Sequence, residues 1–494
     1  MSSYNRFFKN VGLYFLGNFA TKILQFLFIP IYSIYVDVKD YGEYNYVLSI
    51  ISLALPILFC EIWEGVFRFA IERKGKEYSV ISTTTIFLLS SLCLYTAIFL
   101  IVQHFFPIKH SFYILLLAIV NTIAPYWQFS SRALSLNKTY TLSTIVSSFV
   151  SISLNIILIV VFHLGIEALY TANILGGLAL IIVIECKAKI LSHIKASDWD
   201  KKLLKSILIY SIPLAINAIS WWLYTTLNNL IITENLGLTQ NGIYSMAMRF
   251  GTILSLFTLV INMAWLEESF RINEDDDKDV KFSTVLLNLT SFLFAAFIIL
   301  IPLGALIYKY FVFNEYKVGL YLLPLIFLSA IFSTLTNHLG SAFLAAKDSK
   351  SMFWTTLVGG LISLSLSLTF IKIWGMFGAV LGSTCGFISV YYIRIYILNK
   401  YKGYSIRWHN NFILLMFLFL IPLNVLTAKY DNLPILILLF VCMLAIGLYA
   451  NKSIIVLAIN KMRKNDKKNT VVATVNQKKC HKNISFIRRN TKVF

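Results

Sequence analysis

Long apolar runs recur along nearly the whole chain, and short polar segments separate them. Apolar residues fill these runs instead of marking one face of each. A helix needs about 20 residues to cross a hydrocarbon core about 30 Å thick. Fourteen membrane-spanning helices are therefore predicted, over residues 11–35, 44–70, 80–103, 112–131, 140–162, 166–186, 204–233, 242–265, 282–308, 319–346, 351–371, 376–398, 411–426 and 433–459.

The composition supports a membrane protein. Hydrophobic residues make up 58% of the chain and charged residues 13%, with a mean hydropathy of +0.74. Soluble domains have about 45–50% apolar and about 25% charged residues. The first run, over residues 11–35, is too long for the apolar region of a signal peptide, so it is expected to remain as a spanning helix. The predicted fold class is an all-α, polytopic membrane protein.

The distribution of Lys and Arg predicts the orientation, because cytoplasmic loops carry an excess of both. Alternate loops are rich in them, and the intervening loops are poor. The rich side holds the N-terminal segment, the loops near residues 73–76, 132–138, 187–205, 271–281, 347–350 and 400–407, and the tail from residue 461. Both termini are therefore expected in the cytoplasm, with the tail basic and disordered. The net charge of +20 lies in loops and tail, which argues against nucleic-acid binding.

Two short matches indicate an internal repeat. Gly42-Glu43-Tyr44 and Gly242-Ile243-Tyr244 lie 200 positions apart, and glycine turns open two later helices at residues 165 and 375, 210 positions apart. Transporters are often built from such repeats, with the substrate site between the halves. The predicted organisation is an N-terminal lobe of six helices (1–190), a C-terminal lobe of six (191–400), two further helices (401–460) and the tail (461–494), with a central cavity between the lobes.

Two cations lie deep in predicted spans, where an ionisable side chain costs roughly 2.5–3.5 kcal/mol. They are Lys22 in the first helix and Arg249 in the eighth. The polar residues Asn18 and Gln25 share the face of Lys22, and Ser245 and Thr252 share that of Arg249. One interpretation is a cationic site for an anion in a central cavity. The alternative is a structural ion pair or snorkelling to the interface.

Other polar residues within the spans have two interpretations each. In the second helix Glu61, Glu64 and Arg68 share a face, and Glu64 and Arg68 have the spacing of a helix ion pair. These two carboxylates are candidates for ion coupling or for structural pairing. In the seventh helix a stripe that ends at Asn228 is a candidate for ligand contact or for interhelical packing. Glycines at 375, 378, 382 and 386 favour close packing of the twelfth helix.

Motifs of several enzyme classes are absent from the sequence. It contains no GxxxxGK[ST], HExxH or GxSxG motif, and its seven histidines show no metal-ligand spacing. No enzyme activity, metal or cofactor is predicted. Transport against a gradient would have to be driven by an ion gradient, the membrane potential or the substrate's own gradient.

Three segments resemble the Wzx-type polysaccharide (O-antigen) flippases, which belong to the superfamily of multidrug, oligosaccharidyl-lipid and polysaccharide (MOP) exporters. They are FKNVGLYFLGNFATKILQFLFIPIYSIYVDVKDYGEYNYV at the first two helices, NGIYSMAMRF at the eighth and GMFGAVLGS at the twelfth. The resemblance covers nearly the whole chain up to about Ile459, and its motifs are diffuse.

This resemblance implies a V-shaped bundle that flips an undecaprenyl-pyrophosphate-linked oligosaccharide outward by alternating access. The resemblance also implies that cations on helices 1, 2 and 8 hold the pyrophosphate. Lys22, Arg68 and Arg249 match that pattern. Arg68 lies nearer to the cytoplasmic edge than the pattern would place it. The implied setting is the inner membrane of a bacterium and the synthesis of a surface polysaccharide such as lipopolysaccharide. Candidate partners are membrane lipid, a polysaccharide polymerase and a chain-length regulator.

Two rival functions remain open. A drug exporter of the MATE type has the same architecture, but such exporters usually carry a coupling carboxylate in the first helix, where this chain has Lys22. A membrane polysaccharide polymerase or ligase usually has a large external loop, whereas the outer loops predicted here are short.

Overall fold

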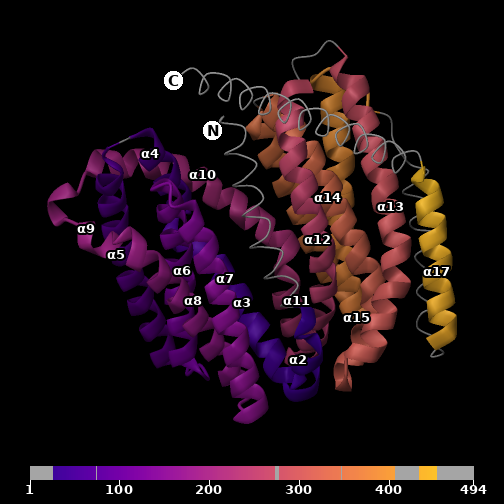
Figure 1. The fold of residues 1–494 in the computed structure, drawn as a ribbon, viewed down its shortest axis with the longest axis horizontal. Helices are drawn as coiled ribbons and strands as arrows, with labels where there is room; N and C mark the ends of the chain where they lie inside the picture. Colours follow the sequence, from indigo (N-terminus) through magenta and orange to yellow (C-terminus); the bar gives the residue numbers. More distant parts are fainter. Residues whose placement is uncertain (1–25, 74, 273–276, 347, 407–432, 453–494) are drawn as a thin grey trace, which may run out of the picture.

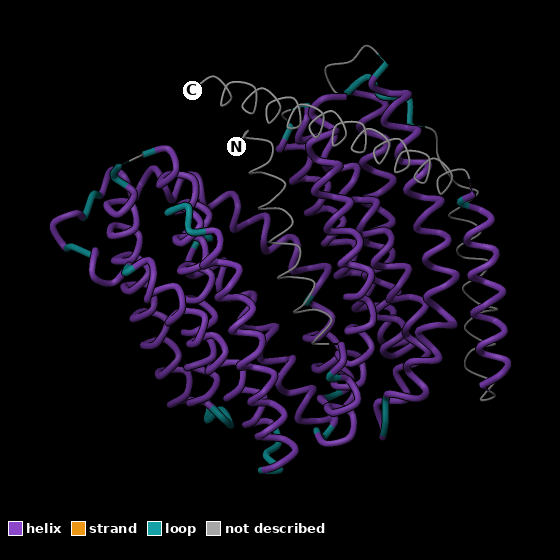
Figure 2. The backbone as a smooth tube through the Cα atoms, viewed as in Figure 1, coloured by secondary structure: helices purple, strands orange, loops and turns teal. Residues whose placement is uncertain are grey.

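The computed structural model describes residues 26–73, 75–272, 277–346, 348–406 and 433–452. The secondary structure of these residues is helical throughout (Figure 2). Nine of their helices are long and apolar enough to span a membrane, and the longest, α15, contains two spans. The prediction of an all-α polytopic membrane protein is confirmed. The total of fourteen spans stays a prediction, because the helix expected over 411–426 lies outside the described residues.

The helices follow the chain in this order: α2 (Ile29–Tyr35), α3 (Val38–Phe59), α4 (Ile62–Glu72), α5 (Glu77–Phe105), α6 (Ser111–Ala133), α7 (Asn137–Ile156), the π-helical turn η1 (Ile157–Val161), α8 (Ile166–Ala188), α9 (Ile190–His193), η2 (Ala196–Asp198), α10 (Lys201–Thr225), α11 (Leu227–Leu236), α12 (Leu238–Ile272), α13 (Lys278–Phe311), η3 (Asn314–Leu322), α14 (Leu323–Ala345), α15 (Ser349–Tyr401) and α17 (Leu433–Ala450).

The helices form two groups that diverge toward the top of Figure 1. The first contains α3 to α8, in which α8 packs against α6 and α7, and the second contains α11 to α15, in which α14 packs against α12, α13 and α15. The groups meet where α3 packs along α12 and α11. Helix α10 contacts both, since it packs on α4 and α5 and also on α15, and α17 packs on α13. The lobe boundaries predicted from the repeat stay a proposal.

Two predicted spans are interrupted, and each break rotates the residues that follow it. The span expected over 44–70 is divided between α3 and α4, because Cys60 and Glu61 adopt left-handed backbone angles four and five residues after Pro56. Proline removes a helical hydrogen bond and clashes with the preceding turn. The span expected over 204–233 is divided at Thr226, whose φ and ψ are −127° and −27°. Helical periodicity therefore does not continue across either break.

Helix α15 is a tight helical hairpin that turns at Trp374 and Gly375, where Gly375 has φ +57°. A Cβ on Gly382 would overlap the backbone of Ser367 in the other arm. The prediction of close packing is confirmed for Gly378, Gly382 and Gly386, while Gly375 forms the turn. At the open end, Asp348 and Lys402 form an ion pair of 2.6 Å. The hydrogen bond from Lys402 and those from Ser351 lower the pKa of the Asp348 carboxyl to about 2.

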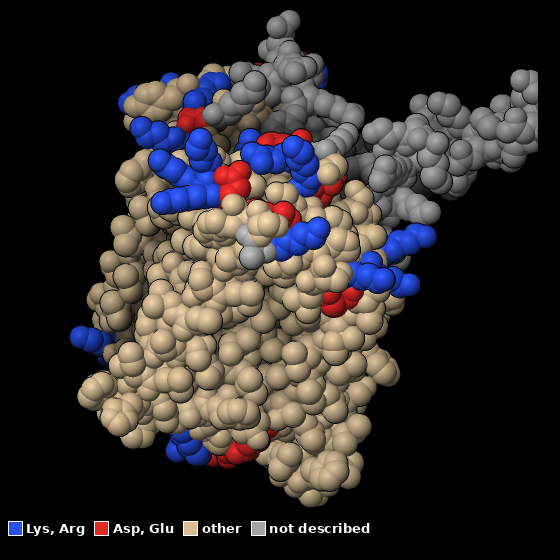
Figure 3. Space-filling model, turned by 90° about the vertical axis from the view of Figure 1, so that its left-hand side faces the viewer, with Lys and Arg blue, Asp and Glu red and all other residues tan. Residues whose placement is uncertain are grey.

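Charged side chains gather at the ends of the helices. Figure 3 shows most of the Lys and Arg of one face in its upper part, above a broad band that is mostly uncharged. The upper end carries α9 and the basic segment that leads into α10 (Figure 1). Because positive charge marks the cytoplasmic side, this end is proposed to face the cytoplasm.

This orientation predicts the labelling of two introduced cysteines. In a variant without the six native cysteines, Lys109→Cys should react with a membrane-impermeant thiol reagent added to intact cells, and Lys195→Cys should react only after the cells are opened. Both positions are exposed, so the membrane alone should decide the difference. The reverse pattern would invert the proposed orientation.

Candidate functional site

A cavity of about 820 Å³ lies between the two groups of helices. One wall comes from α3, α6, α7 and α8, and the other from α11 and α12. The lining is mostly uncharged, and it mixes hydroxyl and amide side chains with aromatic and aliphatic ones. Among the described residues of this lining, Arg249 is the single charged residue. This cavity is a location for the polar site predicted between the halves, and its role in binding stays a prediction.

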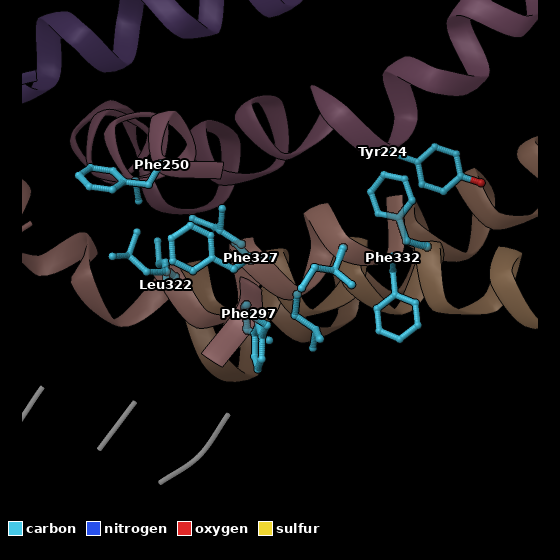
Figure 4. Close-up of a cluster of buried hydrophobic side chains, with 14 of the residues drawn as sticks. Tyr224, Phe250, Phe297, Leu322, Phe327 and Phe332 are labelled. Atoms are coloured by element: carbon cyan, nitrogen blue, oxygen red, sulfur yellow. The ribbon is translucent and has the colours of Figure 1, made fainter. Parts of the chain in front are cut away.

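Arg249 is placed by the packing of its neighbour. Phe250 is buried in the core of the second group, near Phe327 and Leu322 (Figure 4), with its ring centroid 4.9 Å from that of Tyr308. Successive residues of an α-helix point about 100° apart, because a turn contains 3.6 residues. The burial of Phe250 therefore turns Arg249 toward the cavity, where it is half-buried.

Two tyrosines from the first part of the chain hold Arg249. Its Nε donates a hydrogen bond of 2.5 Å to the hydroxyl of Tyr41 on α3. Its guanidinium carbon lies 4.5 Å from the ring centroid of Tyr32 and 5.2 Å from that of Tyr41. Cation–π contacts of this kind contribute about 0.5–2 kcal/mol. The cation thus bridges the two groups of helices at the base of the cavity.

Below the cavity, α3 and α12 approach closely at two glycines. A Cβ on Gly42 would overlap the carbonyl oxygen of Leu238, and a Cβ on Gly242 would overlap that of Val38. Asn241 donates a 2.9 Å hydrogen bond to the carbonyl of Gly42. These are the glycines of the repeated Gly-x-Tyr motif, so the repeat brings equivalent positions against each other. We name this contact, around Gly42 and Gly242, the glycine seam.

The other predicted cations lie elsewhere. Lys22, with Asn18 and Gln25, lies outside the described residues. Arg68 is on α4, with a side chain 52% exposed, and its Nε contacts Glu72 at 3.0 Å. Its hydrogen-bonded partner is thus Glu72, not Glu64, and Arg68 is not among the described residues that line the cavity. The break between α3 and α4 separates its face from the cavity-lining face of α3.

Glu61 and Glu64 lie at this break, half-buried and away from the described lining of the cavity. Glu64 interacts electrostatically with Arg132 of α6. The structure thus supplies a cationic neighbour for one carboxylate, and the coupling role of both stays a prediction.

Asn228 is buried and donates a 3.1 Å hydrogen bond to Ser383 of α15, so it connects two helices of the second group. Its neighbour Asn229 lines the cavity and accepts a 3.0 Å hydrogen bond from Ser245. The break at Thr226 changes which face of the helix points inward. The interhelical contact of Asn228 matches one of its two interpretations, and its role in ligand contact stays a prediction.

Sequence reasoning missed the amides of the opposite wall. Asn45 of α3, Asn121 and Gln128 of α6, Asn155 of α7 and Asn173 of α8 line the cavity. A signal for them exists in α7, where Ser147, Ser151 and Asn155 repeat every four residues within an apolar run and so share one helix face.

Comparison with known proteins assigns the chain to a family. The family model described as "Polysaccharide biosynthesis protein" matches residues 7–266, more than half of the chain. The chain belongs to this polysaccharide biosynthesis protein family. Family and structural neighbours together place this polysaccharide biosynthesis protein in the MOP superfamily.

Solved structures of the superfamily share the fold of this polysaccharide biosynthesis protein. The lipid II flippase MurJ in an inward closed conformation has a TM-score of 0.65 and 17% identity, covering 89% of this chain and 99% of that one. An inward-facing MATE multidrug transporter has a TM-score of 0.58 and 15% identity, covering 78% and 99%. A MATE transporter of Vibrio cholerae has a TM-score of 0.53 and 12% identity, covering 79% and 96%.

One relative in sequence is an uncharacterized membrane protein of Methanocaldococcus jannaschii. It is 24% identical over 201 residues, which are 40% of this chain and 47% of the relative. The match thus spans about half the length of that relative. It supports the assignment to a multi-pass membrane protein.

Proposed function

We propose that this protein flips an undecaprenyl-pyrophosphate-linked oligosaccharide from the cytoplasmic to the outer leaflet of a bacterial inner membrane. The observation that carries the proposal is the position of Arg249 as the single charged residue of the described cavity lining. A pyrophosphate is a dense anion, and the planar guanidinium donates two parallel hydrogen bonds to phosphate oxygens. The neutral polar lining suits a sugar chain.

The proposed cycle is alternating access. The glycine seam closes the cavity at the proposed outer end, while the helix groups diverge at the basic end (Figure 1). A lipid-linked sugar would enter from the cytoplasmic leaflet, and the seam would then separate to release it outward. Lys22, Asn18 and Gln25, and with less support Arg68 and Asn228, are proposed as further substrate contacts. The protein is proposed to act as a transporter that performs no covalent chemistry.

A deletion strain of the bacterial host tests this function. Loss of the gene should trap undecaprenyl-linked oligosaccharide on the cytoplasmic face, where a glycosidase added to spheroplasts cannot reach it, and surface polysaccharide should disappear. Reintroduced protein should restore both. Normal display of the glycan in the deletion strain would contradict the proposal. Loss of drug efflux with unchanged glycan would instead favour an exporter of the MATE type.

A further inference from the structure

A cluster of ionisable side chains lies at the end of the molecule opposite the basic one, where α3, α6 and α8 begin (Figure 1). We name it the outer cluster, and its members are Asp40 and Glu43 of α3, His110 just before α6, and Glu167 and Tyr170 of α8. None of these residues is among the described residues that line the cavity. The proposed substrate site therefore does not account for the outer cluster.

His110 and Glu167 form a pair within this cluster. The side chain of His110 is 10% exposed, and its Nδ1 lies 3.5 Å from Oε1 of Glu167, whose side chain is 37% exposed. A ring nitrogen that faces a carboxylate carries the hydrogen of a neutral imidazole, so Nε2 is left without one. This Nε2 is buried and has no hydrogen-bond partner in the described part of the chain. It can therefore accept a proton, and Glu167 connects the pair to solvent.

The hydroxyl of Tyr170 is a second buried group without a partner. Tyr170 is fully buried, and its hydroxyl makes no hydrogen bond within the described residues. Its ring centroid lies 6.1 Å from that of His110. It interacts electrostatically with the carboxylates of Asp40, Glu43 and Glu167. Buried polar atoms are nearly always paired, so two unpaired ones beside the same carboxylates indicate a ligand that the side chains do not supply.

The charges around this position favour a cation. Carboxylates predominate, because Asp37 and Glu167 interact electrostatically with Asp40, and the cationic side chain that does so is Lys109. Neighbouring carboxylates disfavour each other's ionisation and so favour the uptake of a proton. Metal ligands do not converge here, since no three His, Cys, Asp or Glu side chains of the described ranges are placed to hold a metal ion. The cation that fits these side chains is a proton.

Asp40 connects the outer cluster to the glycine seam. Its carboxylate accepts a hydrogen bond from the backbone N–H of Ile166 at the start of α8, and a Cβ on Gly165 would lie 2.6 Å from its Oδ2. Asp40 stands two residues before Gly42 of the seam. A change of charge in the cluster therefore acts on the end of α3 that packs against α12.

Packed tyrosines connect the cluster to the cavity. The ring centroid of Tyr170 lies 5.5 Å from that of Tyr44. Tyr44 lines the cavity, and its hydroxyl accepts a 2.7 Å hydrogen bond from Asn173. Tyr44 also interacts electrostatically with Arg249. The outer cluster and the proposed pyrophosphate site thus lie at the two ends of one row of side chains.

We propose that His110 and Glu167 form a proton-binding site open to the outside, and that protons moving inward through it drive the lipid-linked oligosaccharide outward. The inference rests on the proposed function and names its energy source. In each cycle a proton from outside adds to Nε2 of His110, forming an imidazolium paired with Glu167. It leaves that nitrogen when the cavity opens to the cytoplasm. The positive charge offsets the carboxylates of α3 and α8 and so favours the closed seam after the substrate has left.

Proteoliposomes with a pH difference and with the membrane potential held at zero test this coupling. Purified full-length protein is reconstituted with the undecaprenyl-linked oligosaccharide extracted from the deletion strain. A brief glycosidase treatment then reports the fraction of glycan in the outer leaflet. Exchange of one proton for one lipid moves glycan to the acidic side in either orientation of the protein, by about tenfold per pH unit. With the lumen more acidic by one unit, the cleaved fraction should fall from about half to about a tenth.

Two variants connect the coupling to this site. His110→Gln and Glu167→Gln should each return the cleaved fraction to about half, while prolonged treatment should still cleave the remaining glycan, more slowly than with native protein. A variant that flips lipid but ignores the gradient has lost coupling, which a structural defect would not produce. His163→Gln is the matched control, because this exposed histidine lies at the same end, between η1 and α8. It should keep the tenfold distribution.

The outcomes separate this inference from the proposed function. Native protein that leaves half of the glycan protected after prolonged treatment would overturn the proposed function together with the inference. Flipping without accumulation on the acidic side would overturn the inference alone, as would tenfold accumulation by both Gln variants. Loss of all flipping in both variants would also overturn it and would assign the pair a structural role. Accumulation that both variants lose and His163→Gln keeps would establish the site.

Discussion

Arg249→Ala is expected to lower the rate of lipid-linked oligosaccharide flipping by about tenfold to a hundredfold or more. A charge-assisted hydrogen bond contributes about 1.5–3 kcal/mol, and each 1.4 kcal/mol corresponds to a factor of ten in affinity. Arg249 is the only cation in the described lining, so no described neighbour can replace it there. Flipping by purified protein in proteoliposomes measures the effect, and glycan export by a complemented deletion strain confirms it in cells.

Three further variants distinguish substrate binding from a structural role of Arg249. Arg249→Lys keeps the charge but loses the planar fork, so it should retain partial activity. Tyr41→Phe removes the acceptor of the 2.5 Å hydrogen bond and keeps the aromatic ring, so its effect should be small. Lys22→Glu, at a position outside the described residues, should be more harmful than Lys22→Ala. Normal transport by Arg249→Ala at normal protein levels would contradict the anion site.

Gly42→Ala and Gly242→Ala are each expected to abolish most transport. The added Cβ would overlap a backbone carbonyl oxygen of the opposite helix, Leu238 in one case and Val38 in the other. A side chain could rotate away, but a helix backbone cannot, so α3 and α12 would have to separate. The glycine seam would then stay open, and the cycle would stop in a state accessible from outside.

Accessibility of the cavity measures this effect. A cysteine at Ser245, which lines the cavity, should react with an impermeant thiol reagent from outside much faster when Gly42→Ala is present. Gly304→Ala is the control, because its Cβ would meet the ring of Phe327 at 3.1 Å and the side chain of Leu323 at 3.4 Å, and both side chains can adjust. Normal transport and unchanged labelling in both seam variants would show that the close approach is not needed for closure.

The sequence by itself determined the class of the protein and much of its layout. Apolar runs of about 20 residues predict spanning helices, because every backbone polar group must be satisfied internally in lipid. The resemblance to the Wzx-type flippases can also be recognised from three sequence segments, and the family match confirms it at the level of the MOP superfamily. The depth of Arg249 in an apolar run, together with the cost of burying its charge, predicts that it faces a cavity, and Arg249 lines one in the structure.

The tertiary structure alone decided which other polar residues face that cavity. Helical periodicity is local, and a break in the helix ends it. After the break at Cys60 and Glu61, Arg68 lies outside the described lining of the cavity. After the break at Thr226, Asn229 lines the cavity and Asn228 does not. The amides that line the cavity from α3, α6, α7 and α8 could not be recognised from any one segment, because only packing brings these four helices together. A neutral amide costs less free energy to bury than a charged group does, so an amide within an apolar run is a weaker sign of a functional site.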